Sequence, residues 1–568
     1  MPAANFLPFP SARAVVMRRL TAEADALMRA AAGYEQQQKF NLAERNYRKL
    51  IELQPDNAFA YNSLGRLLHA KGKPAQAAGA FAHALALVPQ LLEQHYDAMC
   101  ATLLSLSPEL ARAVAQSSPG SAPVEPTPFA GNPLLLQMLR AAPIRHLGLE
   151  RVLTATRTWL VGKVDDGVDD ERLIAFAGAL AAQCFINEYV FAVGAEEETV
   201  VVQLSRHAAD ALVSGRRLPP LIWAVLAAYA PLADLPGATA LATMTLPPAL
   251  RPVIEQQVVE PERERALRAE ILQLTPISGA VSEQVRAQYE ANPYPRWVAP
   301  PAQVEPVSVA QYVAEAVSAN LPRPPHEPLE VLVAGCGTGW HAIALAQRLE
   351  GTSVLAVDLS RASLAYAKLR TPAELSQRLT FAQADIETID GIGRSFDLID
   401  ASGVLHHTAD TFASWRKLLA LLRPDGLMHI GLYSERARGE IAAAQDYLRR
   451  QGYSATAADI RRCRGDLLAN GFADLAKTSD FYTTSECHDL LFHVQEHRVA
   501  IPAIDAFLAA ENLEFLGFEF PPAAKSGLRR TFEGSGWSWR DLARWHALEI
   551  QNPALFSAMY HFWVRKPA

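Results

Sequence analysis

The sequence has 568 residues, which is too long for a single hydrophobic core and predicts about three or four domains. Its 53 lysines and arginines are outnumbered by 60 aspartates and glutamates, the formal net charge is -7, and no long basic block occurs. A chain without a concentrated positive field is not expected to bind nucleic acid.

The cysteines and the apolar segments bear on the compartment. The five cysteines are odd in number and widely scattered, which fits neither a disulfide framework nor a cysteine-based zinc site. The first 20 residues lack a basic segment followed by an apolar core, and the most apolar stretch, residues 221–244, is broken by Pro231 and Pro236. We therefore expect a cytoplasmic protein without a membrane-spanning segment.

Residues 24–91 contain a sequence repeat. Residues of the first copy recur 34 positions later, as in the pairs Leu27 and Tyr61, Ala43 and Ala77, and Pro55 and Pro89. This spacing resembles the tetratricopeptide repeat, which implies pairs of antiparallel helices over residues 1–116, with a degenerate third unit or a capping helix at 92–106. Such helix pairs either cap the rest of the protein or present a groove to a peptide segment of a partner.

A linker and a helical region are expected next. Residues 117–132, "SSPGSAPVEPTPFAGN", are rich in proline, serine and glycine and predict a linker. From 133 to 275 apolar residues recur at helical spacing, as in "LIAFAGALAAQCFINEYVFAV" and "ALRAEILQL", so we expect a helical middle domain without an evident ligand cluster. Residues 276–328 are expected to connect this domain to the next one.

Short apolar runs then alternate with helical ones over residues 329–568. The runs are "LEVLVAG", "SVLAVDL", "RLTFAQAD", "FDLIDASGVL" and "LMHIGLY". This order predicts a parallel sheet with crossover helices, so the expected fold class is α followed by α/β.

The first of these runs leads into a glycine loop, Gly335, Gly337 and Gly339. A dinucleotide fingerprint would need its third glycine at the position of Trp340. A phosphate-binding Walker loop would need a lysine, yet no lysine or arginine occurs between Gly335 and Gln347. The loop therefore predicts an uncharged or zwitterionic ligand group.

Two carboxylates end the next two runs. Asp358 follows the second run, where a carboxylate can accept hydrogen bonds from both hydroxyls of a ribose. Asp385 ends the third run, where it could accept from an adenine amino group while the Ile386 amide donates to the ring. Three features at the carboxyl ends of strands thus indicate a nucleoside.

In this order and spacing, the glycine loop, the two carboxylates and "FDLIDASGVLHH" resemble the class I S-adenosylmethionine-dependent methyltransferases. The resemblance runs from about residue 327 to 568 and implies a Rossmann-like sheet that ends in an antiparallel hairpin. The family usually has an acid at the position of Val333. The cofactor contacts that the resemblance implies are Gly335, Cys336, Gly337, Gly339, Asp358, Leu359, Asp385, Ile386 and Val404.

His406 and His407 are the candidate catalytic residues. They follow the fourth run at the edge where a parallel sheet opens towards ligand, and an imidazole near neutral pKa could take a proton from the acceptor. The alternative is that the pair shapes the pocket wall or contacts the cofactor without moving protons.

A long segment, residues 435–500, is expected to be a helical insertion that builds the acceptor pocket, with Tyr433 just before it. Its "FHVQEHR" contains His493, Glu496 and His497 in the order of the inverted zinc proteases, with the two histidines on one helix face. A zinc-dependent hydrolase is therefore an alternative, although no further ligand is evident and no metal is expected. The same side chains could instead contact the acceptor.

"YEANPYPRW" at residues 289–297 precedes the sheet. Its prolines favour extended backbone, so that Tyr294, Arg296 and Trp297 project in fixed directions. The string could cover the acceptor pocket, or it could be a stiff linker that pins neighbouring domains through aromatic burial.

These features together resemble a bacterial group of tetratricopeptide-repeat methyltransferases. The resemblance implies S-adenosylmethionine as cofactor and methyl transfer as the reaction. Because helix-pair repeats suit peptide segments, we expect a protein or peptide acceptor in preference to a small metabolite. A cofactor-binding scaffold without catalysis is the remaining alternative.

Overall fold

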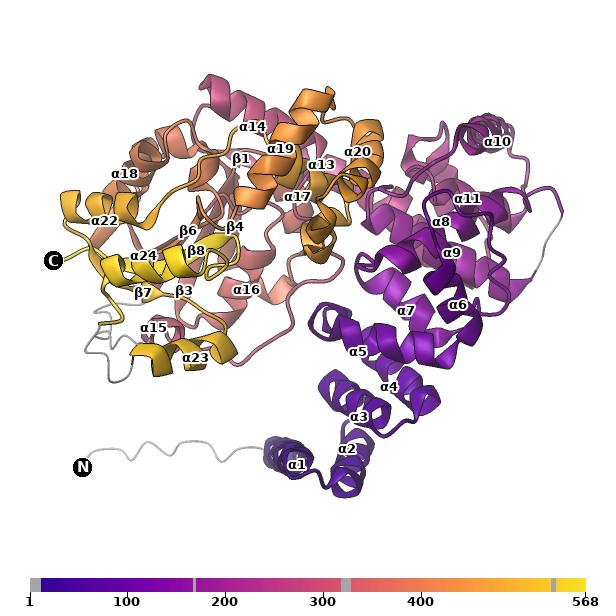
Figure 1. The fold of residues 1–568 in the computed structure, drawn as a ribbon, viewed down its shortest axis with the longest axis horizontal. Coiled ribbons are helices and arrows are strands. Elements are labelled where there is room, and N and C mark those ends of the chain that lie inside the picture. The colour runs from indigo at the N-terminus through magenta and orange to yellow at the C-terminus, as the bar shows by residue number, and fades with distance from the viewer. Residues whose placement is uncertain (1–11, 167–169, 318–327, 533–537) are drawn as a thin grey trace, which may run out of the picture. The chain divides into compact units, whose positions relative to one another are not determined.

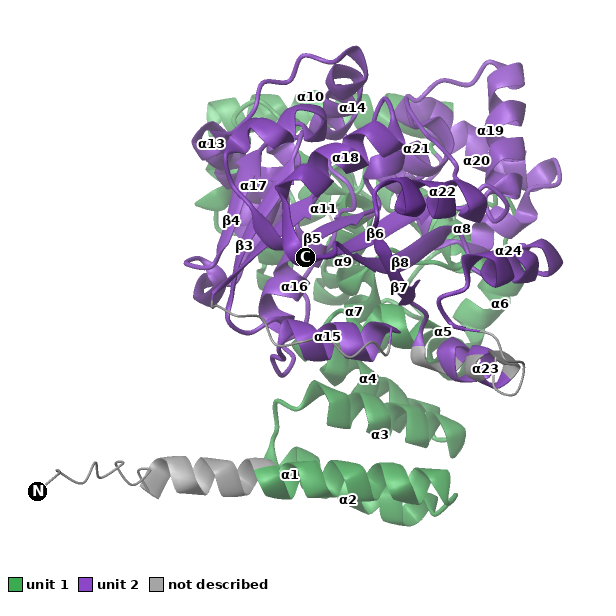
Figure 2. Ribbon diagram, turned by 90° about the vertical axis from the view of Figure 1, so that its left-hand side faces the viewer, with its two compact units in different colours: residues 1–186, 193–253 green, residues 187–192, 254–568 purple. Residues whose placement is uncertain are grey.

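The computed structural model describes residues 12–166, 170–317, 328–532 and 538–568. The first 11 residues, on which part of the expectation about secretion rested, lie outside this range, as does 318–327 of the connecting segment. The chain forms two compact units, an N-terminal unit of residues 1–186 and 193–253 and a C-terminal unit of residues 187–192 and 254–568 (Figure 2). Among the described helices, none has both the length and the apolar character needed to cross a bilayer.

The N-terminal unit consists of helices. Those of the repeat region are α1 (Ala12–Gln36), α2 (Phe40–Leu53), α3 (Ala58–Ala70), α4 (Pro74–Leu87), α5 (Leu91–Leu106) and α6 (Pro108–Gln116). The others are α7 (Pro133–Ala141), α8 (Leu147–Val161), α9 (Glu171–Ile186), α10 (Ala195–Ser214) and α11 (Pro220–Ala227), and α12 (Arg251–Ile254) leads out of the unit. The expected helical repeats and helical middle region are confirmed.

Close packing explains the small residues of the second repeat. Gly65 on α3 faces the ring of Phe81 on α4, and a Cβ at Gly65 would lie only 2.6 Å from that ring. Ala77 and Ala84 on α4 are fully buried. The two helices of the pair therefore approach closely only because these positions carry almost no side chain.

The described residues of the C-terminal unit form one sheet of eight strands in the order β1-β4-β3-β2-β5-β6-β8-β7. The strands β1 to β6 pair in parallel, and β8 is antiparallel to both β6 and β7. This confirms the expected parallel sheet and its antiparallel end. The strands are β1 (Leu272–Gln273), β2 (Leu329–Ala334), β3 (Thr352–Asp358), β4 (Leu379–Gln383), β5 (Phe396–Ser402), β6 (Leu422–Tyr433), β7 (Glu514–Phe518) and β8 (Met559–Arg565).

Helices pack on both faces of this sheet (Figure 1). One face carries α15 (Val309–Val317), α16 (Trp340–Arg348) and α17 (Arg361–Arg370), which pack on alternate residues of β2 such as Val331. The other face carries α18 (Thr411–Leu421), α22 (Ile501–Ala510) and α24 (Leu542–Gln551), around Trp415 and Trp545. Both faces are buried, which explains the continuous apolar runs of the central strands.

The remaining helices are α13 (Glu260–Glu270), α14 (Ala280–Ala291), α19 (Gly439–Gln451), α20 (Ala457–Ala469), α21 (Thr484–Phe492) and α23 (Pro522–Phe532). The expectation of helix throughout "ALRAEILQL" is wrong at its end, because α13 stops at Glu270 and Leu272–Gln273 forms the edge strand β1 against β4. Residues 254–275 thus group with the sheet, although the sequence places a boundary near 275. A two-residue strand is too short for periodicity to reveal.

Candidate cofactor and acceptor site

The glycine loop joins β2 to α16, and its backbone explains why three positions are glycine. Gly335, Gly337 and Gly339 have φ values of +70°, +52° and +83°, in the left-handed region that other residues rarely adopt. A Cβ at Gly335 would lie 2.2 Å from Val404 Cγ2, and one at Gly339 would lie 2.4 Å from Ala367 Cβ. A side chain at Gly335 or Gly339 would push the loop away from these neighbours.

Asp358 ties the end of β3 to this loop. Its Oδ2 accepts a 2.8 Å hydrogen bond from the Gly337 amide, and its Oδ1 accepts one of 2.8 Å from the Ser360 amide. Burial raises the pKa of Asp358 to about 6, against the lowering effect of these amides. The carboxylate is therefore ionised at neutral pH and holds the loop in place.

Asp385 follows β4 and is almost fully buried. Its amide donates to Thr275 Oγ1 at 2.7 Å, and its Oδ1 accepts from the Glu387 amide at 2.9 Å. In the part of the chain that the structure describes, its buried Oδ2 has no hydrogen-bond partner. A buried acceptor left without a donor is costly, which points to a donor supplied by a ligand.

The residues at this edge fit S-adenosylmethionine. The open Oδ2 of Asp385 would accept from the adenine amino group, Asp358 would accept from ribose hydroxyls, and the glycine loop leaves room for close approach of the ligand. When bound, the cofactor supplies a methyl group on a positively charged sulfur. Of the other contacts implied by the resemblance, Cys336 and Ile386 are buried, whereas Leu359 and Val404 keep accessible surface.

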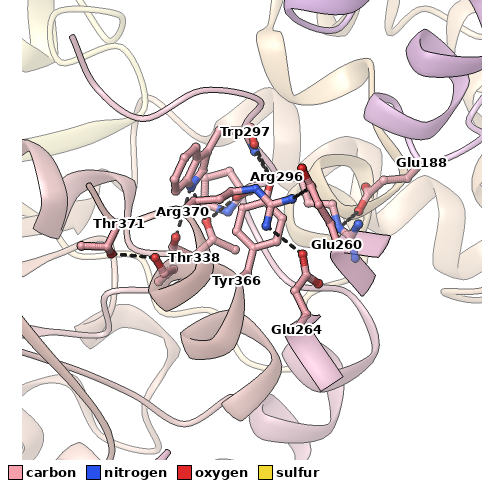
Figure 3. Close-up of polar contacts among 11 residues, drawn as sticks. Glu188, Glu260, Glu264, Arg296, Trp297, Thr338, Tyr366, Arg370 and Thr371 are labelled. Atoms are coloured by element: carbon pink, nitrogen blue, oxygen red, sulfur yellow. Dashed lines mark hydrogen bonds and ion pairs between the residues drawn. The ribbon is translucent and has the colours of Figure 1, made fainter. Parts of the chain in front are cut away.

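Residues 289–297, here called the strap, lie directly on the glycine loop (Figure 3). The indole nitrogen of Trp297 donates to the carbonyl and Oγ1 of Thr338 at 3.2 and 3.1 Å, and Thr338 Oγ1 donates to the carbonyl of Pro295. A Cβ at Gly337 would lie 2.7 Å from the carbonyl oxygen of Tyr294. The strap therefore covers the loop from the outside.

Ion pairs and aromatic contacts anchor the strap (Figure 3). Arg296 Nε lies 3.3 Å from the carboxylate of Glu188, and the Trp297 backbone hydrogen-bonds with the Tyr366 hydroxyl. The guanidinium of Arg370 lies 3.7 Å above the Tyr366 ring and also binds two carboxylates of α13, Glu260 and Glu264. Arg296 and Trp297 thus hold the strap in place through their side chains.

The two candidate catalytic histidines differ in their surroundings. The His406 ring is fully buried, stacks on Tyr433 with centroids 3.7 Å apart, and has no partner at either nitrogen among the described residues. Burial holds its pKa well below the usual range. His407 Nδ1 donates to the carbonyl of Gln495 at 2.8 Å, which leaves Nε2 as the unprotonated nitrogen, and burial lowers the pKa of His407 to about 4.

The structure contradicts the inverted zinc-protease arrangement. Helix α21 ends at Phe492, so His493 and His497 do not share a helix face. Glu496 accepts two hydrogen bonds from the buried guanidinium of Arg438, at 3.2 and 2.8 Å, and His497 Nε2 contacts the carbonyls of Thr408 and Ala409 at 3.1 and 3.2 Å. Glu496 and His497 thus contact other residues instead of forming a site with His493. The zinc-hydrolase alternative therefore lacks the ligand arrangement that it requires.

A directional chain of hydrogen bonds runs from His493 to Asp489. His493 Nδ1 accepts from the Gln495 amide at 3.0 Å, so its Nε2 carries the proton and donates to the Tyr289 hydroxyl oxygen at 3.1 Å. Tyr289 in turn donates to Asp489 Oδ1 at 2.7 Å. The sequence pattern marks neither Tyr289 nor Asp489 as a site residue, because the contact between them joins segments 200 residues apart.

Two groups of histidines and an aspartate bring their side-chain atoms within 4.8 Å of one another. In the first, the rings of His407 and His493 stack with centroids 3.6 Å apart and planes 18° apart. Because nitrogen lone pairs lie in the ring plane, the lone pairs of stacked rings run nearly parallel and do not converge on one ion. This geometry favours proton transfer or packing over metal binding.

In the second group, His341 Nε2 and His429 Nδ1 both contact Asp400 Oδ2, at 2.9 and 2.8 Å. Burial alone would raise the pKa of Asp400, but the two imidazoles hold it well below its usual range, and Asp400 raises the pKa of His341. Asp400 lies directly across from Val333 in the β2–β5 ladder. A carboxylate therefore stands one strand away from Val333, the position where the resemblance led us to expect an acid.

Comparison with known proteins agrees with this geometry. Residues 331–426 match a family model described as a methyltransferase domain, and residues 46–78 match one described as a tetratricopeptide repeat. An uncharacterized protein of Synechococcus is 27% identical over 305 residues, which cover 49% of this chain and 70% of that protein. A trans-aconitate 2-methyltransferase of Deinococcus radiodurans is 33% identical over 117 residues, which cover 21% of this chain and 42% of the enzyme.

Among solved structures, PKMT2 from Rickettsia typhi is 16% identical, with a TM-score of 0.35, over 47% of this chain and 54% of that protein. The chain thus matches less than half the length of the curated trans-aconitate methyltransferase and about half of the rickettsial protein. The matched domain is the segment that contains β2, the glycine loop, Asp358 and Asp385.

Proposed function

We propose that this chain, which belongs to the S-adenosylmethionine-dependent methyltransferases, transfers the methyl group to a protein or peptide. The cofactor is S-adenosylmethionine, in keeping with the methyltransferase domain at residues 331–426. The acceptor is the part of the function that this proposal adds.

The residues of the C-terminal unit would contribute by positioning and by excluding water. Methyl transfer needs the acceptor atom in line with the bond between sulfur and the methyl group, so orientation and dry surroundings provide much of the catalysis. Asp358, Asp385 and the glycine loop would fix the cofactor, while the strap and the segment 435–500 would enclose the acceptor. The strap already covers the loop through Trp297 and Thr338.

The observation that carries the proposal is the presence of helix-pair repeats in a chain whose C-terminal unit has its own candidate cofactor residues. A small metabolite needs only a pocket, whereas repeats of this kind offer an extended surface for a peptide segment. Helix α3 presents an accessible aromatic side chain, Phe59, which is 48% exposed. Such a side chain is suited to contact with a partner segment.

A labelling experiment tests the acceptor class. Purified full-length protein is incubated with a cell extract and a methyl donor that carries tritium in its methyl group, and protein is then separated from small molecules. We expect label in protein, and we expect Phe59→Ser to reduce it while affinity for the cofactor is unchanged.

Val213→Ser provides the matched control, because Val213 is 76% exposed on α10 and lies outside the repeats. Label that enters only small molecules, with Phe59→Ser as active as the parent, would refute a protein acceptor. Absence of any methyl transfer would support the scaffold alternative.

A further inference from the structure

A cluster of phenols, imidazoles and carboxylates lies beside the glycine loop, at the carboxyl edge of β5 and β6. We call it the acceptor cluster, and its members are Tyr289, Tyr294, Tyr433, His407, Asp489 and His493. Tyr294 belongs to the strap whose carbonyl contacts Gly337, and Tyr433 stacks on His406, two residues after the Val404 that packs on Gly335. The cluster is therefore next to the proposed methyl group.

Three rings of this cluster gather around one carboxylate. Tyr289 and Tyr294 stack with centroids 6.4 Å apart, and the carboxylate of Asp489 raises the pKa of Tyr289, Tyr294 and Tyr433 in addition to the effect of burial. The hydroxyls of Tyr294 and Tyr433 have no hydrogen-bond partner among the described residues. The Tyr433 ring is already stacked on His406 and covered by the Arg438 guanidinium, 3.6 Å from its centroid, so the open groups are the phenol oxygens. Phenol oxygens around a carboxylate can accept hydrogen bonds from a cationic group.

The charges of the cluster are unbalanced towards the negative side. Arg438 covers the Tyr433 ring and shares the carboxylate of Glu496 with Arg498. Arg296 of the strap is paired with Glu188. Asp480 and Glu486 add negative charge next to Tyr294. The imidazoles do not compensate, because burial lowers the pKa of His407 to about 4 and that of His493 to about 2. A cationic ligand group would restore the balance.

Asp489 has one oxygen available. Its Oδ1 is held by the Tyr289 hydroxyl, whose orientation is set by His493. No described residue hydrogen-bonds its Oδ2. The chain from His493 through Tyr289 thus fixes the carboxylate and directs its second oxygen to whatever enters the cluster.

We propose that the acceptor is an amine, such as a lysine side chain or a peptide N-terminus, that the tyrosines surround it and that Asp489 binds its ammonium group. This inference rests on the proposed function and specifies its acceptor atom. An acidic acceptor would be repelled by Asp489, and an alcohol would leave the carboxylate without a charged partner.

Methyl transfer to an amine at this site begins with loss of a proton. One ammonium proton passes to Asp489 Oδ2, and the nitrogen lone pair forms a bond to the methyl carbon. The bond between that carbon and sulfur breaks, and its electron pair stays on sulfur as S-adenosylhomocysteine. The positive charge moves from sulfur to the methylated nitrogen, which stays between the tyrosine rings, and Asp489 later releases its proton to solvent. Burial raises the pKa of Asp489 to about 7, which suits a base at neutral pH.

The test compares three probes on the full-length protein saturated with S-adenosylhomocysteine. Nα-acetyl-lysinamide, its neutral 6-hydroxynorleucine analogue and Nα-acetyl-glutamate amide are titrated at pH 7.5, with binding followed by saturation-transfer NMR. We expect the lysine probe to bind about tenfold or more tightly than the alcohol, and the acidic probe most weakly.

Asp489→Asn should abolish the preference for the amine. Asp474→Asn is the matched control, since Asp474 lies in the same segment, 435–500, but its side chain is 62% exposed and pairs with Lys477. Should Asp489→Asn not fold, Tyr289→Phe removes the hydroxyl that holds Asp489 and is expected to weaken the same preference. Equal binding of the lysine and alcohol probes, or tighter binding of the acidic probe, would overturn the inference.

The chemistry of the label separates this inference from the proposed function. Label in protein that is recovered as N-methylated amino acids after acid hydrolysis supports both. Label in protein that base releases as methanol indicates a methyl ester, which leaves the protein acceptor standing and refutes the amine. Label that is found only in small amines would refute the protein acceptor and support the amine.

Discussion

The Gly337 amide donates a 2.8 Å hydrogen bond to Asp358 Oδ2. This contact joins the loop after β2 to the carboxylate at the end of β3, two elements that we propose contact the cofactor. The carboxylate that would hold the ribose therefore also holds the loop that would approach the methionine part of the cofactor. A change at Asp358 should affect both contacts at once.

We expect Asp358→Ala to weaken binding of S-adenosylhomocysteine by about 2 kcal/mol or more, because a charged acceptor is lost from the ribose and from the loop. Calorimetric titration measures this, with the exposed Asp390→Ala as control. In the parent, affinity should fall as pH drops through about 6, where Asp358 becomes protonated. Unchanged affinity in a folded Asp358→Ala protein would refute the assigned role.

Two glycines separate the effect of crowding from that of backbone strain. Gly339 and Gly393 both have positive φ, at +83° and +67°, but a Cβ meets Ala367 at 2.4 Å in the first case and nothing within 4 Å in the second. Gly393→Ala should cost about 1 kcal/mol in unfolding free energy and leave cofactor binding intact. Gly339→Ala should cost several times more and abolish cofactor binding, as measured by denaturant unfolding and calorimetry. Equal effects of the two variants would show that crowding at Gly339 is unimportant.

The sequence predicts the sheet and the loops at its carboxyl edge well, because these depend on local patterns. Short apolar runs, the spacing of Gly335 to Gly339 and the acids at strand ends are each visible within a few residues. The helices of the repeats are visible for the same reason, since the pattern recurs at a fixed period.

The acceptor side depends on contacts between distant segments, which periodicity does not reveal. The strap reaches Thr338 from Trp297 across 41 residues, and Tyr289 reaches Asp489 across 200. The motif from His493 to His497 was misleading because its spacing brings the two histidines to one face only in a helix. Helix α21 ends one residue before the motif. The pairing of Glu496 with Arg438 likewise required the three-dimensional structure.

Arg370 should be important for stability because it links α13 to α17. It binds Glu260 and Glu264 and covers the Tyr366 ring, and its side chain is only 14% exposed (Figure 3). Arg370→Met would leave two carboxylates close together without a cation, and we expect a loss of about 3 kcal/mol in unfolding free energy.

The exposed pair of Arg449 with Asp446 supplies the control for this measurement, since its side chains are 75% and 58% exposed. Arg449→Met should change the unfolding free energy by less than about 0.5 kcal/mol. Similar losses in both variants on urea unfolding would mean that the network around Arg370 adds nothing beyond a surface pair.

The stability of the folded protein should depend on pH through the ionisation of Asp489. Its pKa is about 7 in the folded protein and 3.8 for an unperturbed aspartate, so the folded state binds the proton more tightly than the unfolded state. Ionisation of Asp489 should therefore cost the parent stability as pH rises from about 4 to 7, with the full cost present above 7. Asp489→Asn lacks this cost.

We expect the melting temperature of Asp489→Asn relative to the parent to rise between pH 5 and pH 8 in the absence of ligand. Asp474→Asn, at an exposed position of the same segment, 435–500, should keep a constant difference from the parent over that range. If the difference in melting temperature between Asp489→Asn and the parent stays constant or falls as pH rises, ionisation of this carboxylate does not destabilise the folded protein. Asp489 would then not be a base that titrates near neutral pH.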